Sequence, residues 1–405
     1  MSTIWVLHHY AQPPDGKWTA SHDLASELVK KGHQVTIIAA SFDHYSRKEE
    51  YLKAGQLRLV RDYDGVRFVF LRTTPYSSRF VGRVLNMVSY ACMAFWEGLR
   101  ASPAPDVIVG VTPHPLTPLV ALLLSKIRRA RFFFEVRDLW PLFLVEVGVL
   151  AETGVVARIL YRIELLCLRK AARILTVWPG MITYVEELGV SGAKVVWTPI
   201  GQDMAQVAAR HVSRPKQGNA AEHALLFMYR GGFGYSNDIK LMLDAARLVG
   251  ASHPNTIRFV LAGEGPQKTE MMDYARECGL KNVEFQGFLP KAELAEALSR
   301  ADVLLCSLPD VPHFERYGQI ASKLIDYLAA ARPILLTTHN RSSLVGKSGA
   351  GVVVPPGNPA ALARSIVEIA ESSEEERLQM GRKGLEYLAS HHDITQIAAR
   401  LESVI

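Results

Sequence analysis

Short apolar runs rich in β-branched and aromatic residues recur along the chain, and longer amphipathic stretches separate them. The runs are continuously apolar, which is typical of strands that helices cover on both faces. They occupy residues 4–7, 34–39, 67–72, 106–111, 131–136, 174–177 and 195–198 in the first half, and residues 225–229, 258–263, 283–285, 303–308, 333–337 and 351–354 in the second. Helical periodicity is clearest at residues 20–32, 236–249, 266–279, 291–300 and 359–371. This alternation predicts parallel sheets with helices on both sides.

The alternation is interrupted near residues 199–222, where the chain turns polar and contains Gly and Pro. A chain of 405 residues also exceeds the size of one ordinary core. We therefore predict two doubly wound domains, one at residues 1–200 and one at residues 201–384. Ligands of such sheets bind beyond the carboxyl ends of the strands, so two facing domains are expected to share one cleft.

The composition is that of a folded protein, with 49% hydrophobic and 21% charged residues. The cysteines lie far apart and show no metal-ligand spacing; they are Cys92, Cys167, Cys278 and Cys306. This usage is typical of reduced thiols in the cytoplasm and argues against a zinc site. We expect no signal peptide, because the first apolar run is short and no basic residue precedes it. No run approaches the length of a membrane-spanning helix.

The net charge of +6 is unevenly distributed along the chain. Residues 1–200 hold 24 Lys and Arg against 17 Asp and Glu, whereas residues 201–405 hold 22 against 23. No motif that reads RNA or DNA accompanies the basic half, so we expect no nucleic-acid partner. Residues 79–100, 119–131 and 158–173 each join an apolar helical stretch to several bases. Each alone is typical of a core-facing helix, but together they favour contact with an anionic membrane surface.

Residues 316–335 combine an apolar helical stripe with a polar cluster. The stripe comprises Ile320, Leu324, Tyr327, Leu328 and Ala331, and the cluster comprises Ser322, Lys323 and Asp326. One interpretation is a Lys323–Asp326 ion pair on the surface, worth a few tenths of a kcal/mol. The other is a nucleotide clamp, because a helix that begins near Gln319 and follows the strand at residues 303–308 should point into the cleft.

Two glycine-rich turns follow predicted strands of the second half. They lie at residues 231–238 and 262–268, and Lys268 ends the second turn. Glycines allow a ligand to approach the backbone closely, and a following helix offers amide donors to a phosphate. The first turn fails as a dinucleotide fingerprint because Asn237 stands where Gly or Ala is required, so an NAD enzyme is not expected.

The order of these motifs resembles a known family. The second half contains GGFG, AGEGP, VEFQGFLP, ADVLLCSL and SKLIDYLAAARPIL, and the first half contains KKGHQVTII and FEVRDLWP. Together they are similar to the nucleotide-sugar glycosyltransferases of family 4, which have the GT-B fold of two Rossmann-like domains facing a central cleft. The closest resemblance is to the bacterial branch that assembles O-antigen, capsular or colanic-acid-type polysaccharide on a lipid carrier. The resemblance implies that the last helix, about residues 385–405, packs back on the first domain.

The resemblance implies retaining transfer from a nucleoside diphosphate sugar, such as a UDP- or GDP-sugar, without a metal or other cofactor. Asp326 falls at the position of a glutamate that holds the ribose hydroxyls. Lys323 and Ser322 fall where the diphosphate binds, and Gly232 and Gly234 are expected to face the same phosphates. Lys323 is therefore also expected to stabilise the leaving group.

The resemblance also implies an acceptor side in the first domain. Asp138 lies in the DLWP motif and is expected to contact the acceptor hydroxyl as a base, with Arg137 near an acceptor phosphate. His9 and His114 follow predicted strands and are candidates for acceptor contact, although a structural role is the commoner one for such histidines. The expected acceptor is a lipid-linked glycan, which places the protein in the cytoplasm at the inner face of the plasma membrane.

Some positions depart from the family pattern. Gly318 stands where many relatives have a glutamate, and Arg230, Lys268 or Arg316 would have to supply a cation that relatives carry after the first glycine-rich turn. These departures leave two alternatives open: a UDP-sugar 2-epimerase of the same architecture, and a non-catalytic sugar-nucleotide-binding partner of an assembly complex. Asp62 and Asp64 could form a metal-binding DxD motif, but the glycine that follows favours a hairpin turn.

Overall fold

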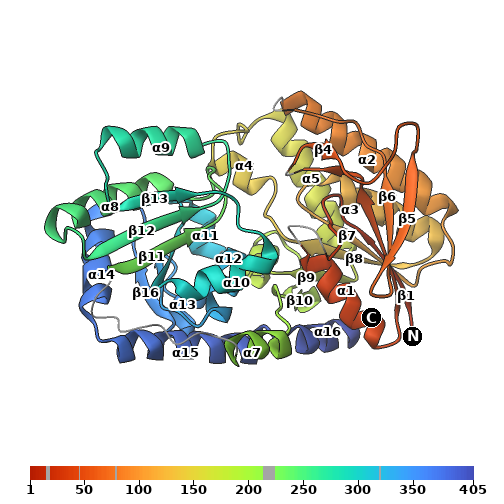
Figure 1. The fold of residues 1–405 in the computed structure, drawn as a ribbon. Coiled ribbons are helices and arrows are strands. Elements are labelled where there is room, and N and C mark those ends of the chain that lie inside the picture. Colours follow the sequence, from red (N-terminus) through yellow and green to blue (C-terminus); the bar gives the residue numbers. More distant parts are fainter. Residues whose placement is uncertain (15–18, 45, 78–79, 213–223, 319–320) are drawn as a thin grey trace. The chain divides into compact units, whose positions relative to one another are not determined.

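The computed structural model describes residues 1–14, 19–44, 46–77, 80–212, 224–318 and 321–405. These residues form two compact units (Figure 1). Unit 1 comprises Met1–Gly201 and Ile394–Ile405, and unit 2 comprises Gln202–Asp393. Each unit contains its own largely parallel sheet with helices packed against it, so the predicted fold class of two doubly wound α/β domains is confirmed.

The sheet of unit 1 has the strand order β10-β9-β8-β7-β1-β2-β6-β5, and only β5 runs antiparallel to its neighbour. Its strands are β1 (Thr3–Leu7), β2 (Gln34–Ala40), β5 (Arg58–Tyr63), β6 (Val66–Leu71), β7 (Val107–Val111), β8 (Arg131–Val136), β9 (Arg173–Thr176) and β10 (Val195–Trp197). A separate short ribbon joins β3 (Phe42–Asp43) to β4 (Lys48–Glu49). Every apolar run of the first half forms a strand. The apolar pattern does not predict β5, because this edge strand is half exposed along its length.

A tight hairpin joins β5 to β6. Asp64 and Gly65 have φ values of 52° and 79°, as a two-residue turn between twisted strands requires. The hairpin interpretation of this segment is thereby confirmed, and Asp62 lies within β5, paired with Arg67.

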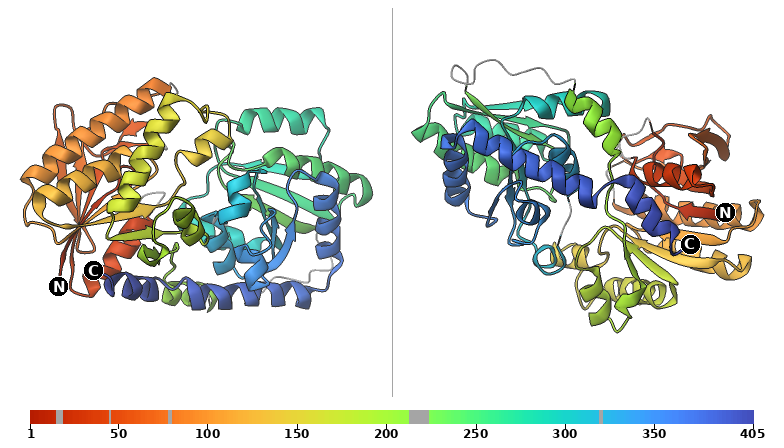
Figure 2. Two further views of the ribbon diagram at one scale, coloured as in Figure 1. Left: turned by 180° about the vertical axis from the view of Figure 1, so that it is seen from behind. Right: turned by 90° about the horizontal axis from the view of Figure 1, so that it is seen from below.

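Helices cover both faces of this sheet. They are α1 (Ala20–Lys30), α2 (Phe80–Arg100), α3 (Leu116–Arg128), α4 (Leu142–Glu146), α5 (Val155–Lys170), α6 (Met181–Glu187) and α16 (Ile394–Glu402), with a 3₁₀ turn at Gly192–Lys194. On one face α1 packs beside α16, as Figure 2 shows, and Leu28 and Leu401 share a core with Ile37 and Phe68 of the sheet. On the other face α2 packs on α3, and α3 on α5.

The sheet of unit 2 is entirely parallel, with the order β13-β12-β11-β14-β15-β16. Its strands are β11 (Leu225–Arg230), β12 (Ile257–Ala262), β13 (Val283–Gln286), β14 (Val303–Ser307), β15 (Ile334–Thr337) and β16 (Gly351–Val354). Its helices are α7 (Met204–Val212), α8 (Ile239–Ser252), α9 (Lys268–Glu277), α10 (Lys291–Arg300), α11 (Pro312–Tyr317), α12 (Lys323–Ala329), α13 (Leu344–Ser348), α14 (Pro359–Glu371) and α15 (Glu374–His391).

The chain between β14 and β15 differs from the prediction of one helix beginning near Gln319. It forms two short helices, α11 and α12, and α11 ends at Gly318, whose φ of 72° favours glycine. Gln319 and Ile320 lie outside the described residues. The predicted apolar stripe is confirmed at Leu324, Tyr327 and Leu328, which are fully buried.

The chain end is divided between the two units. Helix α15 packs against α12 in unit 2, whereas α16 packs against α1 in unit 1. Lys31 pairs with Glu402 at 2.9 Å, and Arg131 donates a hydrogen bond of 2.8 Å to the Val404 carbonyl. The part of the C-terminal region that belongs to unit 1 therefore begins at Ile394.

Candidate active site

Lys323 is a buried cation at the start of α12. It is 7% exposed, and its Nζ donates hydrogen bonds to the Tyr229 hydroxyl at 3.2 Å and to Asn237 Oδ1. The ammonium also lies 4.5 Å from the centroid of the Tyr229 ring. Burial lowers the pKa of Lys323 to about 8; Cys306 acts to raise it and the charge of Arg230 lowers it. Among the described residues, no carboxylate forms an ion pair with Lys323.

The glycine-rich turns pack closely around this ammonium. A Cβ on Gly231 would lie 2.7 Å from Lys323 Nζ and 2.6 Å from the Tyr229 hydroxyl. A Cβ on Gly263, whose φ is 147°, would lie 1.8 Å from the Gly231 carbonyl oxygen. A Cβ on Gly234 would meet nothing within 4 Å. Gly231 and Gly263 are therefore required by packing, whereas Gly234 borders open space.

Asp326 lies one turn further along α12 and pairs with Arg230. Its Oδ2 is 3.2 Å from Arg230 Nη1, and its Oδ1 accepts a hydrogen bond of 3.3 Å from Gln202 Nε2. The hydroxyl of Tyr327 fixes the end of β11, because it accepts a hydrogen bond of 2.8 Å from the Arg230 backbone N–H. The simpler interpretation, a surface ion pair between Lys323 and Asp326, is therefore wrong: Lys323 is buried and contacts Tyr229 and Asn237, whereas Asp326 pairs with Arg230.

The other predicted donor-site residues occupy less distinctive positions. Lys268 is engaged by Glu264 at 2.8 Å and by the Gln286 carbonyl at 2.9 Å, so its charge is largely satisfied by its own turn and by the end of β13. Ser322 precedes α12 without capping it through its side chain. A Cβ on Gly232 would have only the Glu264 carbonyl oxygen within 4 Å, at 3.9 Å, so this glycine is also uncrowded.

In unit 1, the predicted residues His9 and His114 lie side by side. His9 Nδ1 and His114 Nε2 are 2.7 Å apart, and the His9 ring stacks on Tyr90 with ring centroids separated by 4.3 Å. Each imidazole is 1% exposed. Burial, together with the charge of Arg83, lowers the pKa of His114 to about 3, and burial lowers the pKa of His9 as well. Both imidazoles are therefore neutral at physiological pH, and contact with an acceptor stays a prediction.

Arg137 and Asp138 lie in the turn that follows β8. Their backbone N–H groups donate to Thr112 Oγ1 at 2.8 and 3.2 Å, and Trp178 Nε1 donates to the Arg137 carbonyl at 2.8 Å. Arg137 Nε pairs with Glu135 at 2.6 Å, whereas Asp138 is exposed. The turn is thus held by its neighbours, and the Asp138 carboxylate is left accessible.

In each unit the predicted residues gather at the carboxyl ends of adjacent strands, where doubly wound sheets bind their ligands. In unit 2, Arg230, Lys323 and Asp326 meet beside the first glycine-rich turn. In unit 1, Thr112 links the turn after β7 to the turn after β8. Among the described residues, no group of three or more His, Cys, Asp and Glu lies together in a way that could hold a metal ion.

Sequence reasoning missed the partners of Lys323. Tyr229 ends an apolar strand and has no other distinguishing feature in the sequence, and Asn237 is notable there only as a mismatch to the dinucleotide fingerprint. Asn237 is the sixth residue counted from Gly232, where a dinucleotide site needs glycine. This side-chain amide is the one feature of the sequence that could have indicated a partner for Lys323.

Comparison with known proteins identifies the chain. The family described as "Glycosyl transferase 4-like domain" matches residues 15–201, and "Glycosyl transferases group 1" matches residues 224–372. The chain is 23% identical to the colanic acid biosynthesis glycosyl transferase WcaI of Escherichia coli K12, over 87% of both chains. It is 25% identical to the glycosyltransferase WbjE of Pseudomonas aeruginosa, over 73% of both chains.

Solved structures share the fold at low sequence identity. Sucrose-phosphate synthase of Thermosynechococcus elongatus superimposes with a TM-score of 0.73 at 17% identity, covering 100% of this chain and 98% of that one. HepE of Anabaena, solved with UDP and glucose, gives a TM-score of 0.66 at 12% identity, covering 100% and 99%.

The two sheets and the matches to both halves define a glycosyltransferase of the GT-B class. The chain belongs to family 4 of these enzymes, with a glycosyl transferase 4-like domain followed by a group 1 domain.

Proposed function

We propose that the enzyme transfers a sugar, with retention and without a metal, from a UDP- or GDP-sugar to a lipid-linked glycan acceptor during surface polysaccharide assembly. The names of WcaI and WbjE, and the lipopolysaccharide glycosyltransferase WaaG among the structural neighbours, support this class of product. Neighbours solved with UDP and UDP-glucose support a sugar-nucleotide donor.

The proposal of a donor site in unit 2 rests mainly on one observation, the buried charge of Lys323. Burying an ammonium without a carboxylate partner is unfavourable, and such a site gains most from binding an anion. Lys323 has three N–H donors, and two of them reach Tyr229 and Asn237. The third is available for a diphosphate oxygen. Because negative charge grows on the leaving diphosphate in the transition state, this contact would favour the transition state over the bound substrate.

The remaining donor contacts follow from positions around Lys323. Asp326 has two oxygen acceptors for the ribose hydroxyls, and ligand binding would compete with its contacts to Arg230 and Gln202. Arg230 supplies a second positive charge beside the diphosphate. Gly232 and Gly234 leave room for the phosphates to approach the backbone, and Ser322 would add a hydroxyl donor.

The acceptor would bind at the carboxyl ends of β1, β7 and β8. Asp138 is the exposed carboxylate there and would accept the proton of the acceptor hydroxyl. His9 and His114 are buried and neutral, so their contribution would be to hold the turn after β1 in place.

A membrane contact would be made by the outer surface of α2, α3 and α5. Exposed apolar side chains line these helices, namely Val81, Leu85 and Trp96 on α2, Leu123 and Ile127 on α3, and Val155, Val156 and Ile159 on α5. Basic residues accompany them on all three helices, which suits an anionic headgroup layer. No helix in the described parts of the chain is long and apolar enough to cross a bilayer.

The test is to incubate the purified enzyme with membranes that carry the acceptor and with a panel of labelled UDP- and GDP-sugars. Label should enter the lipid fraction with one of the donors, and Lys323→Met should slow this transfer roughly 10²- to 10³-fold. If no donor labels lipid and free UDP-GlcNAc is converted to its 2-epimer, the epimerase alternative is correct. Nucleotide binding without any turnover would identify a non-catalytic binding partner.

A further inference from the structure

Arg83 is a cation that neither the motifs nor the proposed function assign. It lies in the first turn of α2, is partly exposed, and forms no ion pair with a described residue. Its Nε is buried and has no hydrogen-bond partner in the described part of the chain. A guanidinium group can only donate hydrogen bonds, so this buried N–H is available to an acceptor that is not part of the protein.

Two other unpartnered nitrogen atoms belong to the same end of the unit 1 sheet. Arg137 Nη1 and His114 Nδ1 are buried without a partner among the described residues. The charges of Arg83 and Arg137 both act on the Asp138 carboxyl: burial raises its pKa, and the two arginines lower it. Asp138 is exposed, so solvent weakens the effect of burial on this carboxyl. Both arginines therefore lie within electrostatic reach of the carboxylate that is proposed to meet the acceptor hydroxyl.

The hydroxyl of Tyr10 completes this group. Burial raises the pKa of Tyr10, and the adjacent guanidinium of Arg83 lowers it. The charge of Arg83 also lowers the pKa of His114, whose main perturbation is burial. Tyr10 and His114 thus remain neutral hydrogen-bonding groups beside the arginine, and they add no charge that would repel an anion.

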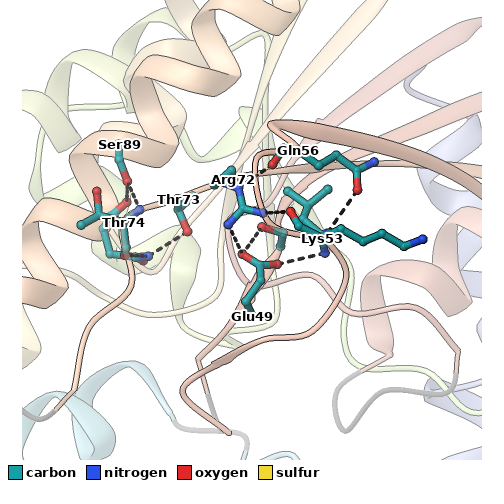
Figure 3. A network of polar contacts seen from close by, with 10 residues as sticks. Glu49, Lys53, Gln56, Arg72, Thr73, Thr74 and Ser89 are labelled. Atoms are coloured by element: carbon teal, nitrogen blue, oxygen red, sulfur yellow. Dashed lines mark hydrogen bonds and ion pairs between the residues drawn. The ribbon is translucent and has the colours of Figure 1, made fainter.

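The start of α2 is fixed by contacts with the chain after β6 (Figure 3). The Asn86 amide donates to Thr73 Oγ1 at 2.9 Å and to the Thr74 carbonyl at 2.7 Å, and Ser89 Oγ accepts from the Thr74 N–H at 2.9 Å. In the same network Arg72 pairs with Glu49 at 3.7 Å. Arg83 is therefore presented from an anchored helical turn, which limits the ordering that a ligand would require.

The surroundings of Arg83 distinguish the source of the anion. Val81, Val84 and Leu85 are exposed on the same part of α2, at 67%, 39% and 53% of their surface. An anion that binds at Arg83 therefore lies beside an apolar surface suited to hydrocarbon. A phosphate carried on a lipid would use both the cation and the apolar surface, whereas a free phosphate would use only the cation.

We infer that Arg83, together with Arg137 and Tyr10, binds the phosphate or diphosphate group of the acceptor. This inference rests on the proposed function only in taking the acceptor to carry that group. Binding of an inorganic anion tests the site independently of transfer.

The first experiment is calorimetric titration of inorganic pyrophosphate into enzyme already saturated with UDP, so that the donor site is occupied. Wild-type enzyme should bind pyrophosphate, Arg83→Gln should weaken this binding roughly tenfold or more, and its affinity for UDP should not change. Arg83→Lys should recover part of the loss because it keeps the charge. Arg61→Gln, an exposed arginine on the edge strand β5, is the matched control and should bind pyrophosphate as wild type does. Absence of pyrophosphate binding to the UDP-saturated wild type overturns the inference.

The second experiment separates the sources by transfer kinetics with three acceptors: a glycan on a polyprenyl diphosphate, a soluble glycosyl phosphate, and a phosphate-free glycoside. Arg83→Gln should raise KM about tenfold for the polyprenyl diphosphate and leave the phosphate-free glycoside unaffected. An equal effect on the soluble glycosyl phosphate would show a phosphate site without a lipid component. An equal effect on all three acceptors would show that Arg83 is only structural. If no acceptor is used at all, the proposed function fails, and the pyrophosphate titration still decides the binding site.

Discussion

The strongest chemical feature at the residue scale is a lysine whose charge is buried without a carboxylate. Lys323 is only 7% exposed, its pKa is lowered to about 8 by that burial, and its two protein partners are neutral. In the absence of ligand the charge destabilises the folded state. If Lys323 binds the donor diphosphate as proposed, its function conflicts with stability, which is expected where a protein prepares a site for an anion.

Replacing Lys323 by Met should separate these two effects. The free energy of unfolding should rise by roughly 1 to 3 kcal/mol, because an apolar side chain of similar length replaces a buried charge. The kcat/KM for the donor should fall roughly 10²- to 10³-fold. Urea denaturation and steady-state kinetics measure the two changes. Lys347→Met, at an exposed position of the same unit, is the control and should change neither. A destabilised Lys323→Met enzyme would contradict this account.

The pH dependence of nucleotide binding should show the titration of the Lys323 ammonium. The folded pKa of about 8 lies below the ordinary value of 10.5, so the folded protein releases this proton at lower pH than the unfolded chain. Between these values the unfolded state binds more protons, and the contribution of Lys323 to stability increases with pH. UDP binding requires the charged form, so its affinity should weaken above pH 8 by up to roughly tenfold per pH unit. Calorimetric titrations from pH 7 to 9.5 should show this slope in the wild type and lose it in Lys323→Met.

Two glycines of the first turn offer a matched pair of substitutions. Gly231→Ala places a methyl group 2.7 Å from Lys323 Nζ and should displace the ammonium, raising the donor KM roughly tenfold. Gly234→Ala meets no protein atom within 4 Å, so the free energy of unfolding should stay within about 0.5 kcal/mol of wild type. A loss of donor affinity in Gly234→Ala without a loss of stability would place the ligand against that glycine. Equal KM values for wild type and Gly231→Ala would show that the position of Lys323 does not matter for binding.

At the scale of elements, prediction succeeded where local sequence determines the structure. Continuous apolar runs predicted every strand of the two main sheets except the half-exposed edge strand β5, because the other strands are covered on both faces. The helix predicted at residues 359–371 has those bounds. The Asn358 side chain caps its start by accepting a hydrogen bond of 2.9 Å from the Ala361 N–H, and Pro359 is compatible with its first turn.

Prediction failed where tertiary contacts determine the structure. One helix, beginning near Gln319, was predicted between β14 and β15, yet the chain also forms α11 before Gly318. The pairing of His9 with His114 joins residues 105 positions apart, and no local pattern reports it. The partners of Lys323 are likewise distant in sequence, so the lysine was predicted as part of the site while its burial was not.

The helical layer of α2, α3 and α5 yields a prediction at the same scale. Leu85, Ile127 and Ile159, one on each helix, are 53%, 54% and 49% exposed, so their triple replacement by Ser should leave folding intact. Binding to vesicles of phosphatidylglycerol should weaken at least roughly tenfold, because each apolar side chain contributes of order 1 kcal/mol when it enters the interface. Vesicle sedimentation measures this. Replacement of Leu248 and Met272 of unit 2 by Ser is the control. Unchanged binding of the triple variant would exclude this surface as the membrane contact.

At the scale of the whole molecule, the sequence predicted two nucleotide-fold domains, a family and the unequal charge of the two halves. The excess of positive charge lies within residues 1–200, the part of unit 1 that carries the apolar, basic helices and Arg83. The sequence did not reveal Arg83 as a separate feature, because one arginine among several at the end of an apolar helix has no distinctive spacing.

The proposed catalysis without a metal concerns the complete enzyme and can be tested directly. In the proposed site Lys323 and Arg230 neutralise the leaving diphosphate, so transfer in excess EDTA should proceed at the same rate as in MgCl₂. Initial rates with and without the chelator measure this. Loss of activity in EDTA that is restored by Mg²⁺ or Mn²⁺ would contradict metal-independent transfer.

The most direct test of the central claim is a crystal structure of the enzyme with UDP or GDP bound. The account predicts that a diphosphate oxygen lies roughly 2.7–2.9 Å from Lys323 Nζ. It also predicts that Asp326 accepts hydrogen bonds from the ribose hydroxyls beside the turn at Gly232 and Gly234. A nucleotide bound elsewhere, with Lys323 still contacting only Tyr229 and Asn237, would contradict it.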